Sequence, residues 1–184
     1  MCLKDRKYFI ILFLFSMLLF TCKNERLEKK YEVKIDSGCS FQLTLPEESI
    51  QKISVDTNDS LSNGDITHSF KLDNDSSELK IIFNRIDFWD TEVKNYTDLK
   101  ESLVGLKMGE YIFSEVLSST FMKIDTLRFL KVKYGILLLG TETVYSTMQN
   151  GKIISFEFIS HKYESGYFVQ SETEIMSGIS LLCK

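Results

Sequence analysis

Residues 141–160 read TETVYSTMQNGKIISFEFIS, and this stretch decides the fold. Asn150-Gly151 lies between two runs rich in β-branched and aromatic residues. An Asn-Gly pair in that position favours a two-residue hairpin turn, because both central residues of such a turn need positive φ angles. The stretch therefore predicts two antiparallel strands, 141–148 and 153–160, joined by a tight turn.

Alternation of apolar and polar residues, which is the period of a strand, continues outward from this hairpin. Pro46 ends one of these strands, because proline cannot donate a ladder hydrogen bond. Residues 111–117 fit a strand or a frayed helix, and the apolar stretch 135–140, GILLLG, favours a long strand or a bend over membrane insertion. The predicted strands cover 31–35, 41–45, 66–72, 79–83, 120–125 and 127–134, with a weaker patch at 53–55.

Residues 96–107 have helical spacing instead, with Leu99 and Leu103 on one face. Asn95 or Thr97 can cap the start of this helix, because each has a side-chain oxygen that can accept from a free backbone N–H.

The end of the chain, 171–182, also predicts a helix. Ser171 and Glu174 have the spacing of a capping box, and Ile175, Ile179 and Leu182 form an apolar stripe. The order of strands, a central helix, more strands and a closing helix predicts an α+β domain with a single antiparallel β-sheet covered by helices.

Four of these pieces, in this order, resemble the PsbP-like family, which includes the DcrB-type bacterial lipoproteins. They are FQLTLP at 41–46, the helix at 96–107, NGKIISFEFIS at 150–160 and SETEIMSGISLL at 171–182. The resemblance covers about 31–182 and departs from the family at GILLLG and at the irregular segment before the central helix. It implies an α/β/α sandwich that serves as an accessory or binding module rather than as an enzyme.

The first 21 residues have the three parts of a secretion signal. Lys4, Arg6 and Lys7 supply the positive start, and the thirteen residues 8–20, YFIILFLFSMLLF, form the apolar middle. A helix needs about 20 apolar residues to span a bilayer, so this run is too short for a membrane anchor.

Residues 19–22, LFTC, resemble the lipobox that lipoprotein signal peptidase recognises, with Thr21 where Gly or Ala is usual. We therefore expect cleavage of the signal peptide 1–21, palmitate-type acylation of Cys22, a flexible tether at 22–30 and a globular domain at 31–184. Acyl chains on one residue hold a protein firmly at a membrane. The alternative is a plain signal peptide or signal anchor, in which the cysteine has no role.

Location and charge restrict the partners of the domain. Lys23, rather than Asp, follows the cysteine, which favours the outer membrane of the cell envelope. Without residues 1–21, the 22 basic and 26 acidic residues fall to 19 and 25, a net charge of −6. Nucleic acid is excluded as a partner because phosphate binding needs clustered Lys and Arg. The membrane and an envelope protein remain as the expected partners.

Two cysteines remain once Cys2 leaves with the signal peptide and Cys22 carries lipid. Cys39 and Cys183 can form one disulfide in an oxidising compartment, or they can stay as two buried free thiols. The sequence leaves both alternatives open.

No metal or cofactor is expected. The two histidines do not share a metal-binding spacing, and we expect His68 on an apolar strand face and His161 in solvent. The acidic residues of 73–78 lack the pattern of a calcium loop and fit a polar turn. No glycine-rich phosphate loop is present.

Phe88, Trp89 and Asp90 are the expected partner-binding residues, because tryptophan in a loop is enriched at binding hot spots. The alternative is a partly buried Trp89 that fills the end of the sheet beneath the helix.

The leading functional hypothesis is a non-enzymatic, membrane-anchored accessory or binding lipoprotein. An envelope immunity or inhibitor protein against a delivered toxin is the alternative, because an acidic surface can mask a cationic enzyme. An envelope hydrolase is a third hypothesis. It would need a pocket with converging titratable groups, for example around His68, Asp87 and Asp90.

Overall fold

The computed structural model describes ten strands and three helices within residues 28–35, 38–51, 53–58, 65–72, 77–85, 93–110, 114–136, 140–160 and 166–183. The predicted signal peptide, Cys22, Phe88, Trp89 and Asp90 lie outside these ranges. Three residues of the predicted tether, 28–30, belong to the first strand.

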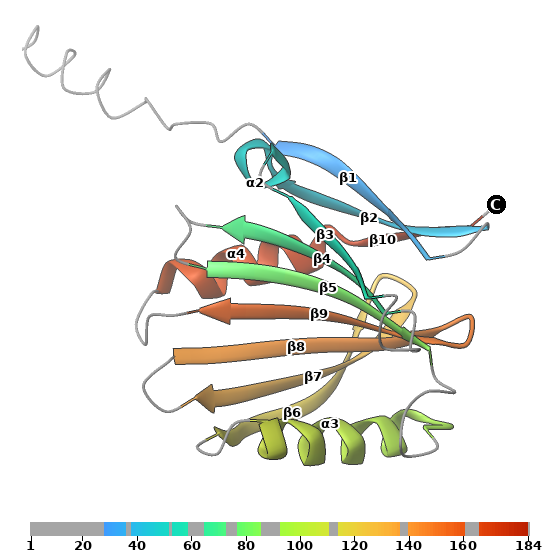
Figure 1. Cartoon of the computed structure of the whole chain (residues 1–184), viewed down its shortest axis with the longest axis vertical. Coiled ribbons are helices and arrows are strands. Elements are labelled where there is room, and N and C mark those ends of the chain that lie inside the picture. Colours follow the sequence, from blue (N-terminus) through green and yellow to red (C-terminus); the bar gives the residue numbers. More distant parts are fainter. Residues whose placement is uncertain are drawn as a thin grey trace, which may run out of the picture.

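Seven strands form one antiparallel sheet (Figure 1), in the order β3-β4-β5-β9-β8-β7-β6. The predicted hairpin is confirmed at its centre, where the turn residues Asn150 and Gly151 have φ angles of 50° and 72°. The strands are β3 Ser54–Asn58, β4 Asp65–Leu72, β5 Ser77–Arg85, β6 Ser114–Ile124, β7 Leu127–Ile136, β8 Gly140–Gln149 and β9 Lys152–Ser160.

A second, three-stranded sheet has the order β1-β2-β10. Its strands are β1 Glu28–Lys34, β2 Cys39–Pro46 and β10 Ser180–Cys183. The prediction of a single sheet covered by helices is therefore wrong: the molecule is mostly strand, in two sheets. Alternating sequence shows that a strand has one buried face, but it does not show which sheet that strand joins.

The predicted closing helix is also wrong in its bounds. Helix α4, Gly166–Ser177, begins before Ser171, so Ser171 lies inside the helix and not at its predicted start. The helix ends where the Gly178 N–H donates to the backbone oxygens of Glu174 and Ile175. The chain then turns into β10, on which Leu182 is 44% exposed instead of buried.

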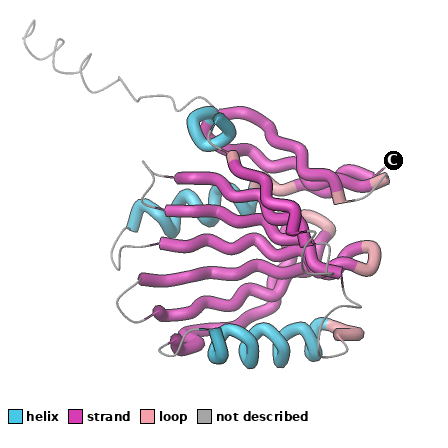
Figure 2. The backbone as a smooth tube through the Cα atoms, in the orientation of Figure 1, coloured by secondary structure: helices cyan, strands magenta, loops and turns pink. Residues whose placement is uncertain are grey.

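Helix α3, Tyr96–Glu110, is the long central helix, and its predicted cap at Asn95 is confirmed. The Asn95 Oδ1 accepts from the backbone N–H groups of Thr97, at 2.8 Å, and Asp98, at 3.1 Å. A short helix, α2 Glu47–Gln51, follows β2 and was not predicted. Figure 2 shows α2 and α3 at the top and bottom of the view and α4 behind the strands of the large sheet.

The large sheet has a core on each face. On one face, β1, β2 and α4 pack against it, and Phe41 of β2 meets Phe156 of β9 with ring centroids 5.4 Å apart. On the other face, Leu99 and Leu103 of α3 pack over β7 and β8. Opposite faces of the sheet are buried by different elements, which explains the runs of consecutive buried residues in β8 and β9.

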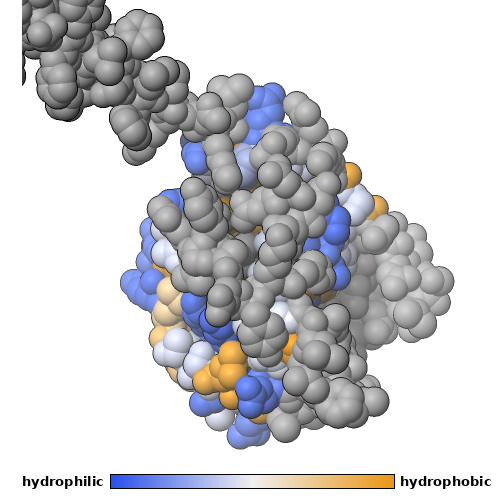
Figure 3. Space-filling view, turned by 90° about the vertical axis from the view of Figure 1, so that its left-hand side faces the viewer, coloured by the Kyte–Doolittle hydropathy of each residue, from blue (hydrophilic) through white to orange (hydrophobic). Residues whose placement is uncertain are grey.

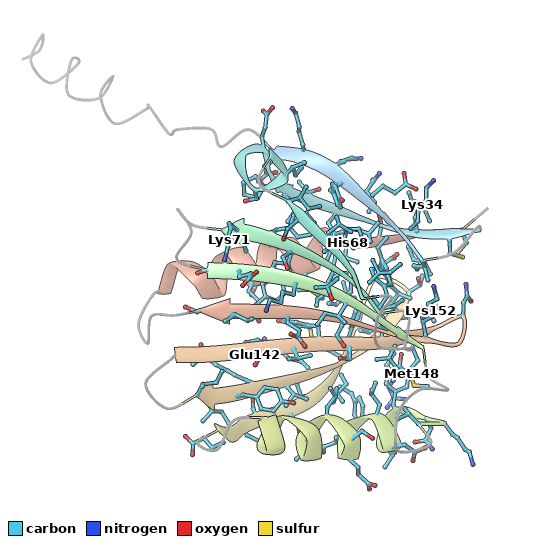
Figure 4. The ribbon with its side chains drawn as sticks, viewed as in Figure 1. Lys34, His68, Lys71, Glu142, Met148 and Lys152 are labelled. Carbon is cyan, nitrogen blue, oxygen red and sulfur yellow. A yellow bond between two sulfur atoms is a disulfide. The ribbon has the colours of Figure 1, made fainter. Side chains whose placement is uncertain are left out.

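One link joins the three-stranded sheet to the large sheet, and a second lies within the three-stranded sheet. The Lys152 Nζ of β9 donates to the Ile35 backbone oxygen at 2.6 Å, which connects the two sheets (Figure 4). Cys39 and Cys183 are directly opposite in the β2–β10 register and are joined by a disulfide across 144 residues of sequence. The C-terminal strand is thereby fixed to β2.

The outer surface is mixed in character. Among the residues coloured in Figure 3, hydrophobic groups appear as small patches between hydrophilic ones. None of the helices in the described ranges is long and apolar enough to span a membrane.

Candidate functional site

The hairpin between β6 and β7 carries an open hollow at its turn. The turn consists of Asp125, with φ 52°, and Thr126. The hollow has a volume of about 310 Å³ and is lined by Phe121, Met122, Lys123, Thr126 and Arg128. Its lining joins aromatic, aliphatic and cationic side chains, which is the combination typical of surfaces that bind other proteins.

Arg128 is stacked on two aromatic rings at the edge of this hollow. Its guanidinium carbon lies 4.5 Å from the ring centre of Phe121 and 4.8 Å from that of Tyr96. The two rings meet edge to face, with centroids 6.1 Å apart. These distances are those of cation–π interactions, which hold a guanidinium in one orientation.

Tyr96 is itself fixed by its hydroxyl group. The hydroxyl donates to the Arg128 backbone oxygen at 2.7 Å and lies 3.1 Å from the Thr147 Oγ1. The Met148 N–H donates to the same hydroxyl at 3.4 Å. Tyr96 is the first residue of α3, so the cap at Asn95 and the contacts to β7 and β8 together position the ring beneath Arg128.

Phe121 is 39% exposed although it is a large apolar side chain. It faces the same side of the sheet as α3, because its register partner, Leu130, is buried against that helix. Phe121 lies on the outermost strand, so its ring is only partly covered and stays available to a partner. We call the set Tyr96, Phe121, Lys123 and Arg128 the hairpin surface.

A second polar group lies in the interior between α4 and the sheet. The Tyr145 hydroxyl donates to the Glu172 Oε1 at 2.5 Å, and the Lys131 Nζ donates to the same oxygen at 2.9 Å. Glu172 is 5% exposed, and burial together with the Glu172 carboxylate raises the pKa of Tyr145 well above its usual value. These contacts hold α4 against β7 and β8, and we assign them a structural role.

His68 lies between the two sheets (Figure 4). Its ring packs edge to face on Tyr31 and Phe83, and its Nδ1 is 3.4 Å from the Tyr31 hydroxyl. Burial lowers the pKa of His68. Asp87 and Asp90, the partners that a hydrolase site was expected to need, lie outside the described residues.

The α3-facing side of β8 and β9 also carries buried polar groups. The hydroxyls of Ser146 and Ser155 are 2.8 Å apart, and Glu142 and Glu157 are 1% and 9% exposed. Among the described residues, no group of three or more His, Cys, Asp or Glu side chains is placed to hold a metal ion.

The hairpin surface was missed by the sequence analysis. Its residues are separated by as many as 32 positions, and the pairing of β6 with β7 and the start of α3 bring them together. One signal was present: Phe121 falls on the polar face of a strand that alternates, next to Lys123. Cys39 and Cys183 are brought together in the structure, whereas Cys22 and Phe88–Asp90 lie in parts of the chain that are not described.

Comparison with known proteins finds similarity in structure alone. No protein-family model matches the chain, and no curated protein matches it in sequence. The solution structure of cyanobacterial PsbP (CyanoP) from Synechocystis sp. PCC 6803 superposes with a TM-score of 0.59 at 13% identity, covering 84% of this chain and 92% of that one.

A Pseudomonas aeruginosa protein of unknown function, PA94, gives a TM-score of 0.47 at 7% identity, covering 82% of this chain and 94% of that one. That likeness is too low to carry an argument. The superposition on the cyanobacterial structure shows the fold. On this evidence the chain has the PsbP-like fold.

Proposed function

We propose that this chain is a bacterial lipoprotein whose domain acts as a non-enzymatic binding module, held at an envelope membrane by lipid on Cys22. The hairpin surface carries the proposal: an exposed phenylalanine and an arginine fixed on two rings surround an open hollow. Aromatic residues and arginine dominate the energies of protein interfaces. The PsbP-like fold is compatible with this role, because related folds supply accessory modules.

The position of β1 limits how far the domain could extend from a lipid on Cys22. β1 begins at Glu28, six residues after Cys22. An extended chain spans at most about 3.5 Å per residue, so the domain would stay within about 20 Å of the lipid. Figure 1 shows β1 beginning at the top of the molecule and the yellow β6–β7 turn at mid-height, behind the right-hand half of the large sheet.

The anchor is tested in living cells with an alkyne-labelled fatty acid. The full-length chain should incorporate the label and Cys22→Ser should not. Equal labelling of both, or labelling of neither, would overturn the lipoprotein assignment.

The binding surface is tested in the same cells with a photo-crosslinking amino acid. Thr126 is exposed and lines the hollow, whereas Val55 is 49% exposed on β3, the opposite edge of the large sheet. A discrete crosslinked species should form from position 126 and be absent from position 55. The same species from both positions, or none from position 126, would contradict a binding role for the hairpin.

A further inference from the structure

We propose that the hairpin surface binds an acidic peptide segment of a partner protein, with Arg128 holding a carboxylate of that segment. The inference rests on the proposed function, because it names the ligand class of the same surface. Three observations support it: the fixed guanidinium, a repulsive pair of cations, and the apolar side chains beside them.

The first observation is the orientation of Arg128. Both neighbouring rings contact its guanidinium, and Tyr96 is in turn fixed by its hydroxyl contacts. Within the described part of the chain, no side-chain or backbone oxygen accepts a hydrogen bond from this guanidinium. A planar guanidinium that is held in place presents two parallel N–H donors, the geometry that a carboxylate accepts in a bidentate pair. Little side-chain entropy remains to be lost when the ligand binds.

The second observation is the pairing of Lys123 with Arg128. The two residues are directly opposite in the β6–β7 register. Like charges in that position destabilise a sheet, and among the described residues neither cation has an ion-pair partner. The acidic residue nearest in sequence to Lys123 and Arg128 is Asp125, an exposed residue of the turn. Two uncompensated cations on a chain of net charge −4 form a local positive site, and an anionic ligand would relieve their repulsion.

The third observation is the apolar part of the hollow. Phe121 and Met122 line it together with the two cations. A ligand that fits both parts carries an apolar side chain next to carboxylates, as a Glu-rich segment with one Phe or Leu does. Two cations are too few for the cooperative phosphate contacts that nucleic acid needs. A lipid headgroup is the other source of an anionic ligand, and the experiment below tests it separately.

The experiment titrates the purified lipoprotein in detergent micelles with three peptides and follows the backbone amide resonances by NMR. The peptides are acetyl-EEFEE-amide, acetyl-QQFQQ-amide and acetyl-KKFKK-amide. We expect the acidic peptide to shift the amides of residues 120–128 and to bind at least ten times more tightly than the glutamine peptide. The lysine peptide should not bind.

Substitutions then test which residue binds the carboxylate of the peptide. Arg128→Lys keeps the charge but loses the planar fork, so the affinity for the acidic peptide should fall about tenfold. Lys123→Gln should lower it about threefold. Lys133→Gln is the matched control, because Lys133 lies on β7 like Arg128 but on the opposite face of the sheet. This variant removes one positive charge and should leave the affinity for the acidic peptide unchanged. Amide spectra of each variant check that the fold is retained.

The outcomes separate the two proposals. Equal affinity for the acidic and glutamine peptides would overturn the proposal of an acidic ligand. An unchanged affinity of Arg128→Lys for the acidic peptide would overturn it as well. Tighter binding to phosphatidylglycerol vesicles than to the acidic peptide would overturn it in favour of a lipid headgroup. If none of the peptides binds while position 126 still crosslinks in cells, the acidic ligand is wrong and the binding role stands. If position 126 forms no crosslink in cells, both the acidic ligand and the binding role are wrong.

Discussion

Tyr145 of β8 donates a hydrogen bond from its hydroxyl to the Glu172 Oε1 of α4 at 2.5 Å. The Lys131 ammonium donates to the same oxygen. The carboxylate is buried, so its two donors compensate for its lost hydration. A buried acid of this kind is costly unless its partners stay in place. The position of α4 on the sheet therefore depends on a few polar atoms as well as on the apolar contacts of Ile175, Met176 and Ile179.

Removal of the Tyr145 hydroxyl should destabilise the protein. In Tyr145→Phe, Glu172 keeps only Lys131 as a donor, and we expect the free energy of unfolding to fall by about 1–3 kcal/mol. Urea unfolding followed by circular dichroism measures this change. Tyr31→Phe is the matched control, because the Tyr31 hydroxyl makes only the 3.4 Å contact to His68 and should matter less. A larger loss in the control than in Tyr145→Phe would contradict the role given to this contact.

The disulfide should contribute to stability through the long loop that it closes. Cys39 and Cys183 are 144 residues apart, and loss of a native disulfide costs about 2–5 kcal/mol. The double variant Cys39→Ser/Cys183→Ser should show a urea midpoint that is lower than that of the oxidised protein and insensitive to dithiothreitol. Mass spectrometry after alkylation without reductant checks the bond itself. Two alkylated thiols at these positions in the oxidised protein would show that the bond is absent.

His68 should make the protein less stable in mild acid. Burial lowers its pKa in the folded state below the ordinary value of about 6.5. The unfolded chain therefore binds more protons in this range, so stability is full above about pH 6.5 and falls as the pH drops through the lowered pKa of the folded state. Urea midpoints measured between pH 7.5 and pH 5 report the slope, and His68→Gln should flatten it. An unchanged slope in the variant would assign the pH dependence to other groups.

The cap of α3 should support the hairpin surface. Asn95→Ala removes the oxygen that accepts from two backbone N–H groups, and such a loss costs about 1 kcal/mol. Because Tyr96 begins the helix, we also expect chemical-shift changes at Phe121 and Arg128. Thermal unfolding and NMR measure the two effects. Thr97→Ala, at the position next to Tyr96, is the control and should alter neither by a comparable amount.

Local chemistry determined much of the fold in advance. The Asn150-Gly151 turn, the strands beside it and the Asn95 cap depend on contacts between residues close in sequence, and the structure confirms all three. The last segment shows the limit of this reasoning. Ile175 and Ile179 have helical spacing, yet the backbone leaves the helix at Gly178, and pairing with β2 makes 180–183 a strand.

The sequence by itself predicted the leader that would deliver a lipid to Cys22, the strand and helix periods and the central hairpin, because each depends on neighbours along the chain. Tertiary structure alone decided that there are two sheets, that Cys39 meets Cys183, and that Tyr96, Phe121 and Arg128 form one surface. The physical reason is that strand pairing and side-chain stacking join residues far apart in sequence. Local alternation sets which face of a strand is buried but leaves its partner unspecified.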